Sequence, residues 1–132
     1  MHSHTGITAR SALTPRSDRA SVLTKATLRA AEILGLTNTA LARVIGVSPA
    51  TVTRMGRGDY LLREDSKEWE LSTLLVRLYR GLDAITAADE RALHAWMHNE
   101  NLELQARPID LIGQVQGLVE TVAYVDAYRA RI

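Results

Sequence analysis

The sequence has no cysteine and no phenylalanine among its 132 residues. Without cysteine, the chain cannot form a disulfide scaffold, a thiolate metal site or a cysteine nucleophile, and it suits a reducing compartment. Its apolar runs are far shorter than a membrane span, and residues 1–19 lack the apolar stretch of a signal peptide. Together these absences predict a soluble protein of the cytoplasm.

Arrangements that carry catalysis or bind metal are also missing. There is no glycine-rich phosphate loop and no nucleophile paired with a base. His94 and His98 have a metal-capable spacing, but no third ligand accompanies them, so two exposed histidines is the preferred interpretation. Asp89 and Glu90 lie in the first turn of an expected helix, where the helix dipole favours anions. We expect no enzyme activity, no metal and no cofactor.

The residues that are present favour helices. Hydrophobic residues make up 46% of the chain, and alanine, leucine and valine dominate, a composition that suits closely packed helices. No stretch alternates apolar and polar residues between turns, as a half-buried strand would. The sequence therefore predicts an all-α fold.

Periodicity and capping signals divide this fold into segments. Helices are expected over Ser21–Leu34, Asn38–Ile45, Ser48–Met55, Ser66–Gly81, Thr86–His98 and from Pro108 to the C-terminus, with a break near Gly113 or Gly117. Residues 1–19 are interpreted as a flexible arm, whose Arg10, Arg16 and Arg19 either contact phosphates or stay solvated. The expected units are this arm, a DNA-binding unit over residues 20–64 and a second helical unit over residues 65–132.

Charge is distributed unevenly along the chain. Residues 1–63 carry nine Lys and Arg against three Asp and Glu, a net charge of +6, whereas residues 64–132 carry seven against twelve, a net charge of −5. A basic half can approach phosphates, and an acidic half is repelled by them. Chance is the alternative explanation, so the asymmetry matters because the basic half also contains the following motif.

The spacing over residues 38–59 fits a helix-turn-helix. Ala42 is small where the second helix crosses the first, and Gly46 stands at the turn position that needs a positive φ. Val52 then packs the second helix onto the first. The crossing angle depends on all three residues, so the set predicts a helix-turn-helix. A purely structural helix pair is the alternative.

The second helix of this motif supplies the candidate DNA-binding residues. Val52 and Met55 are expected to point inward and Thr51 to lie at the margin. Arg54 is the candidate for bidentate hydrogen bonding to guanine, with a simple phosphate contact as the alternative. The full set of candidates is Ser48, Pro49, Ala50, Thr51, Thr53, Arg54 and Arg57. Because so few of them can read bases, we expect a homodimer and a contribution from DNA shape.

These residues also carry a resemblance to known families. Residues 20–60 resemble the Xre helix-turn-helix family through the Ala42, Gly46 and Val52 spacing. Residues 66–132 resemble the toxin-binding domain shared by Xre, MbcA and ParS antitoxins. The matching stretches are Leu75–Asp83, Ala95–Met97 with Asn101, Arg107–Ile112, Gly117–Val119 and Tyr124–Arg129.

The resemblance implies an antitoxin that represses its own operon and neutralises a RES-domain toxin, an enzyme that depletes NAD. It also implies that the C-terminal helix and tail block the toxin's active site. Carried onto this chain, the toxin-binding residues are Tyr124, Tyr128, Arg129, Arg131 and the terminal Ile132. A frayed C-terminus without a role is the alternative.

The sequence also allows two other functions. A stand-alone helix-turn-helix regulator would use its C-terminal half only to dimerise or to sense a ligand. A protein-interaction module would keep a helix-turn-helix that no longer binds DNA, an alternative that the small number of base-reading side chains leaves open. A neighbouring gene for a RES-like protein would favour the antitoxin over both.

Overall fold

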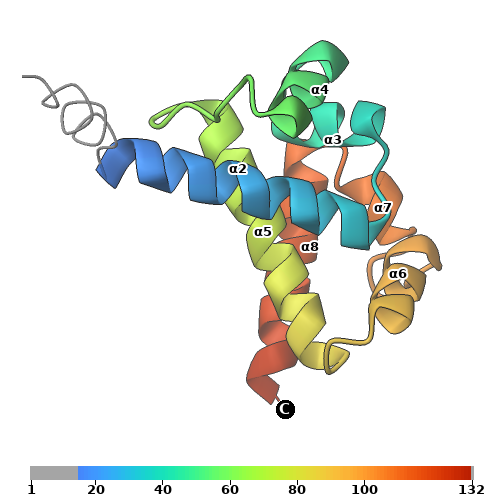
Figure 1. Ribbon diagram of the computed structural model, residues 1–132. Coiled ribbons are helices and arrows are strands. Elements are labelled where there is room, and N and C mark those ends of the chain that lie inside the picture. Colours follow the sequence, from blue (N-terminus) through green and yellow to red (C-terminus); the bar gives the residue numbers. More distant parts are fainter. Residues whose placement is uncertain (1–14, 132) are drawn as a thin grey trace, which may run out of the picture.

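The computed structural model describes residues 15–131, and over this range it contains seven helices and no named strand. The prediction of an all-α fold is therefore confirmed. The helices are α2 (Pro15–Leu34), α3 (Asn38–Ile45), α4 (Pro49–Arg57), α5 (Lys67–Ile85), α6 (Glu90–His98), α7 (Pro108–Leu111) and α8 (Val115–Arg131), shown in Figure 1.

Side-chain caps explain where several helices begin. The Thr37 hydroxyl accepts a hydrogen bond from the backbone N–H of Ala40, and Ser48 and Ser66 cap α4 and α5 in the same way. Such caps satisfy backbone donors that have no partner inside the helix. Gly46 ends α3 at a φ of 77°, a left-handed conformation that costs glycine little. The turn chemistry predicted for this region is confirmed.

The first helix begins earlier than predicted. It starts at Pro15 rather than Ser21, so residues 15–19 belong to α2 and not to a flexible arm. Arg19 pairs with Glu64 at 3.7 Å and lies over the ring of Trp69 at 5.9 Å, which ties the helix start to α5. Arg10 lies outside the described residues.

Two further helix boundaries differ from the expected ones. Thr86 does not begin α6 but ends α5, and Asp89 caps α6 by accepting from the N–H groups of Arg91 and Ala92. The break in the last helical region falls between α7 and α8, around Gly113, whereas Gly117 is buried inside α8. A Cβ on Gly117 would overlap the backbone carbonyl of Leu111, so glycine permits this close packing.

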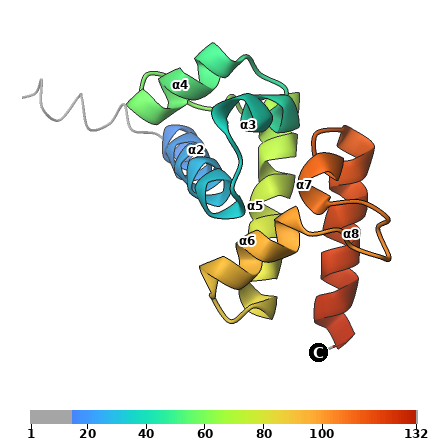
Figure 2. The ribbon, with the colours of Figure 1, turned by 90° about the vertical axis from the view of Figure 1, so that its right-hand side faces the viewer.

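One hydrophobic core joins both parts of the chain. Helix α5 contacts α2 and α3 on one side and α8 on the other, and Figures 1 and 2 both show α8 beside α5 and running in the same direction. Leu75, Leu78 and Leu82 of α5 are fully buried in a cluster that extends from α2 to α8. Thus the core is continuous across residue 64, where the sequence suggested a boundary.

Over residues 15–131, no helix combines the length and the apolarity that crossing a membrane would require.

Candidate nucleic-acid and partner interfaces

Helix α4 is held by its apolar side against α3. Val52 is 1% exposed and Met55 is 3% exposed, and Ala42 of α3 is also buried. Their burial fits the packing predicted from the spacing of the motif. The opposite side of α4 faces away from this core.

The open side of α4 presents most of the candidate DNA-binding residues. Pro49, Ala50, Thr53, Arg54 and Arg57 are all exposed, and so is the capping residue Ser48. Thr51 differs from the prediction, because it is buried rather than marginal. Its hydroxyl lies 2.9 Å from that of Ser48 and accepts a hydrogen bond from Arg54. Thr51 therefore orients another side chain instead of facing solvent.

Two contacts hold the Arg54 guanidinium in place. Its Nη2 donates to Thr51 Oγ1 at 3.0 Å, and its Cζ lies 5.7 Å from the centre of the Tyr60 ring. A guanidinium at this distance is attracted to the aromatic face. Arg54 is thus both exposed and oriented, as a residue that reads a base edge must be.

Tyr60 is in turn fixed by a buried carboxylate. Its hydroxyl donates to Glu68 Oε2 at 2.7 Å, and the backbone N–H of Arg63 donates to the same oxygen at 2.9 Å. Glu68 is only 7% exposed. Burial raises the pKa of Tyr60, and its hydrogen bond to Glu68 raises that pKa further. The sequence analysis missed both residues, since neither belongs to the helix-turn-helix spacing.

The predicted toxin-binding residues divide between two sides of α8. Tyr124 and Tyr128 line a small cavity of about 120 Å³ together with Trp96. Arg129 and Arg131 are exposed, and Arg129 lines a separate groove between α2, α5 and α8. Ile132 lies outside the described residues.

Tyr124 is more firmly held than a tail residue would be. Its ring stacks on Trp96 with centroids 6.3 Å apart, and its hydroxyl donates to Glu103 Oε1 at 2.8 Å. This hydrogen bond raises the pKa of Tyr124, with burial as the second cause. Tyr124 therefore anchors the segment between α6 and α7, while Tyr128, at 41% exposure, remains accessible to a partner.

The two histidines of α6 have a structural role. Their rings stack with centroids 4.0 Å apart, and His98 Nε2 lies 3.2 Å from the carbonyl oxygen of Leu34 at the end of α2. His94 is exposed as predicted, but His98 is half-buried, because it packs against α2. Among residues 15–131, no group of three or more ligating side chains could hold a metal.

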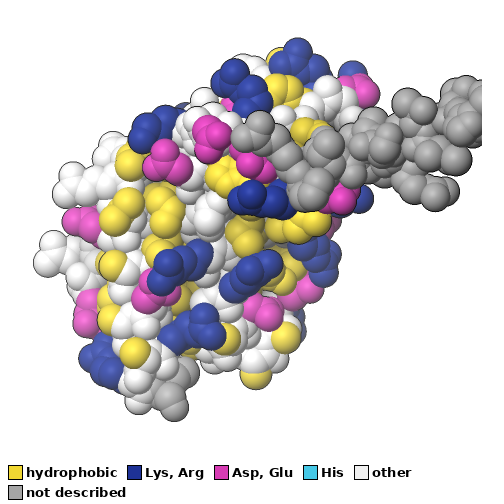
Figure 3. All heavy atoms as spheres, turned by 90° about the vertical axis from the view of Figure 1, so that its left-hand side faces the viewer, with side chains coloured by type: hydrophobic (Ala, Val, Ile, Leu, Met, Phe, Trp, Pro, Cys, Tyr) yellow, Lys and Arg dark blue, Asp and Glu magenta, His cyan; other side chains and the backbone are white. Residues whose placement is uncertain are grey.

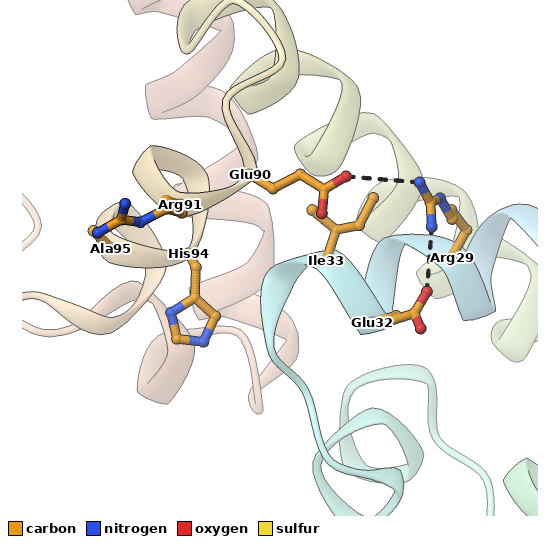
Figure 4. A pocket seen from close by; sticks show the side chains of 7 residues that line it. All are labelled: Arg29, Glu32, Ile33, Glu90, Arg91, His94 and Ala95. Carbon is orange, nitrogen blue, oxygen red and sulfur yellow. Dashed lines mark hydrogen bonds and ion pairs between the residues drawn. The ribbon is translucent and has the colours of Figure 1, made fainter.

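A charged pocket of about 530 Å³ lies beside His94, between α2 and α6 (Figure 4). Arg29 crosses it, pairing with Glu32 at 3.3 Å and with Glu90 at 3.7 Å. The acidic and basic groups of this pocket thus compensate one another. Arg91 also lines the pocket, so its two arginines balance Glu32 and Glu90 and leave no excess formal charge to attract an ion.

Two family models together match most of the chain. Residues 15–77 match the antitoxin Xre-like helix-turn-helix domain, and residues 81–131 match the antitoxin Xre/MbcA/ParS C-terminal toxin-binding domain. No curated protein matches the chain. The first model contains α4 with its exposed face and the second contains α6, α7 and α8. The boundary between the models falls inside α5, the helix that joins both parts of the core.

Proposed function

The chain belongs to the Xre/MbcA/ParS-type antitoxins, and we propose from this that it represses its own operon and neutralises a RES-domain toxin that depletes NAD. In this proposal α4 binds operator DNA, and the C-terminal end of α8 blocks the active site of the toxin. Both activities belong to the cytoplasm, where operator DNA and NAD are found.

The observation that supports DNA binding most directly is the open side of α4. Arg54 hydrogen-bonds to the O6 and N7 atoms of a guanine, because its guanidinium offers two parallel donors. Pro49 and Ala50 supply apolar contact to a thymine methyl group. Ser48 and Arg57, at the two ends of the helix, contact phosphates and fix its register on the duplex.

These contacts are few for one protomer, so the proposed repressor is a homodimer. Two copies of α4 would occupy successive major grooves and double the number of contacts without any additional base-reading residue. Sedimentation of the protein on the DNA upstream of its gene measures this directly. Two chains per operator half-site pair are expected, and one chain per duplex would exclude a dimeric repressor.

Arg54→Ala tests the DNA-binding part of the proposal. We expect it to weaken binding to the upstream DNA by ~1–3 kcal/mol in a gel-shift titration, since a bidentate contact is lost. Arg91→Ala is the matched control, because Arg91 is an exposed arginine of α6. Equal binding by wild type and Arg54→Ala would reject α4 as the recognition helix.

The toxin-binding part depends on the exposed end of α8. Tyr128, Arg129 and Arg131 are all exposed there, and the proposed contact extends to Ile132, the next residue in the sequence. A toxin pocket that binds the phosphates of a dinucleotide is electropositive. Arg129 and Arg131 then contact acidic groups at the rim of the pocket, and Tyr128 supplies apolar area.

Removing residues 127–132 tests this part separately. Co-expressed with the toxin encoded beside it, the shortened protein should protect growth less well, while its binding to the upstream DNA stays unchanged. Full protection by the shortened protein would reject the blocked active site. A neighbouring gene product that neither arrests growth nor consumes NAD would reject the identity of the toxin.

A further inference from the structure

A groove of about 590 Å³ runs between α2, α5 and α8. Figure 3 views the side of the molecule on which this groove opens, and it shows hydrophobic side chains exposed among those of Lys and Arg. Apolar side chains from α2 and α5 line the groove: Val22, Leu23, Ala26, Trp69 and Val76. Val22 is 65% exposed. Apolar surface gathered in one groove is typical of a binding site rather than of a solvated face.

Four arginines border this apolar floor, namely Arg19, Arg77, Arg80 and Arg129. Arg19 and Arg77 have carboxylate partners, Glu64 at 3.7 Å and Asp126 at 2.8 Å. Within residues 15–131, neither Arg80 nor Arg129 forms an ion pair. Asp18 is the one acidic residue among the described lining residues. The border therefore has an excess of positive charge.

The dimensions of the groove suit a short helix. Its lining extends along α5 from Trp69 to Arg80 and along α2 from Asp18 to Ala26. At 1.5 Å per residue these stretches are roughly 16 Å and 12 Å long, the length of about two to three helical turns. A helix lying in a groove buries an apolar stripe and keeps its flanks polar.

We propose that this groove binds an amphipathic helix of another protein, with an apolar stripe flanked by carboxylates. The stripe covers Val22 and Trp69, and the carboxylates pair with Arg80 and Arg129. This surface is distinct from the proposed DNA-binding face, because no residue of α4 lines the groove. It gives the antitoxin a third binding surface, which meets the proposed toxin-binding end of α8 at Arg129.

Charge argues against the other possible occupants. A second copy of this chain that used the same groove would bring the same four arginines to face the first set. Residues 1–14 contain Arg10 and no acidic residue, so they do not complement the border either. DNA would satisfy the arginines but would leave the apolar floor uncovered, since its backbone presents phosphates and sugars.

The intrinsic fluorescence of Trp69 allows a direct test in the full-length protein. The chain has two tryptophans, so Trp96→Phe leaves Trp69 as the only tryptophan. The probe is a synthetic amphipathic peptide of about 14 residues with leucines at helical spacing and glutamates on both flanks. The control peptide has lysine in place of every glutamate.

We expect the acidic peptide to change the Trp69 emission saturably and the basic peptide to leave it unchanged. Arg80→Glu combined with Arg129→Glu should weaken binding by about tenfold or more, because it reverses the charge at the border. Arg43→Glu combined with Arg91→Glu is the matched control, since both arginines are exposed and neither lines the groove. Thermal unfolding confirms that each variant is folded.

Several results would overturn the proposal. Failure of the acidic peptide to bind, or equal binding of both peptides, would reject the complementarity. Dimerisation that Val22→Glu abolishes would identify a second copy as the occupant. A gain in peptide affinity on removal of residues 1–14 would identify that segment. A change in Trp69 emission with random-sequence duplex, lost in the Arg80 and Arg129 variant, would identify nucleic acid.

Discussion

Replacing Glu68 with alanine should destabilise the protein, because this carboxylate joins the segment that follows α4 to α5. Glu68 lies in the first turn of α5 and is 7% exposed. It accepts hydrogen bonds from the hydroxyl of Tyr60 and from the backbone N–H of Arg63, both in the segment that follows α4. Alanine offers no acceptor, so both donors lose their partner.

The size of the effect follows from the burial of these groups. A buried donor without a partner costs about 1–3 kcal/mol, and Tyr60 is only half-buried, so water recovers part of its loss. The Arg63 guanidinium lies 3.9 Å from Glu68 and its side chain is 73% exposed, so this ion pair adds little. We therefore expect a loss of roughly 2–3 kcal/mol, equivalent to a Tm lowered by about 10 °C.

Thermal unfolding followed by circular dichroism measures this loss. Glu70→Ala is the matched control: Glu70 also lies in the first turn of α5, but its side chain is 66% exposed and pairs with the exposed Lys67. The control should change stability by less than about 0.5 kcal/mol. Glu68→Gln, which keeps one acceptor, should fall between the two. A Glu68→Ala protein as stable as the Glu70→Ala protein would refute the reasoning.

Four other changes have expected outcomes that thermal or chemical unfolding can check. Gly117→Ala should cost more than about 3 kcal/mol, because its Cβ would overlap the backbone of Leu111, whereas Gly56→Ala in α4 should stabilise by about 0.5–1 kcal/mol, since nothing lies within 4 Å of that position. Tyr124→Phe should cost about 1 kcal/mol of stability, because it loses the hydrogen bond to Glu103 while keeping the stacked ring. In the wild type, ultraviolet absorbance should show Tyr124 ionising above the ordinary phenol pKa. The hydrogen bond therefore contributes stability at neutral pH, and this contribution is lost as pH rises through the pKa of Tyr124 in the folded protein. Residues 1–64 expressed alone should lack cooperative unfolding, because the buried face of α2 packs on α5.

Local signals were sufficient to predict most of the helices. Thr37, Ser48 and Ser66 each stand directly before a helix and accept a backbone hydrogen bond from it. Gly46 and Gly58 end helices in the left-handed conformation. A cap acts within one turn of the chain, so its residue type identifies the boundary without knowledge of the fold.

Boundaries that depend on distant contacts could not be predicted in this way. The start of α2 is supported by Arg19, which reaches Glu64 and Trp69 some fifty residues away in the sequence. Thr86 is of a residue type that often caps the start of a helix. Its hydroxyl instead donates to the carbonyl oxygen of Leu82, one turn earlier in α5, and Thr86 stands at the end of that helix. Nothing local distinguishes these two uses of a threonine.

The candidate site shows the same limit. Helical spacing predicted that Val52 and Met55 face inward, because burial follows a period of 3.6 residues. The same spacing placed Thr51 at the margin of the exposed side of α4. The hydroxyl of Thr51 instead lies beneath the surface, where it accepts a hydrogen bond from Arg54. The support of Arg54 by Tyr60, and of Tyr60 by Glu68, crosses from α4 to α5. Such a relay has no periodic signature in the sequence.

The position of α5 explains how two functions share a short chain. Its first turn supplies Glu68, which holds Tyr60 beneath the Arg54 guanidinium. Its later turns pack on α8, with Gly81 so close to Val125 that a Cβ there would come within 2.6 Å. Buried side chains of α5 belong to the same core as those of α2 and α8. A shift of α8 on binding a partner must therefore either move α5 or break this packing. Close-packed protein interiors transmit strain. Packing contacts and hydrogen bonds therefore join Arg54 to the toxin-binding domain through a single helix.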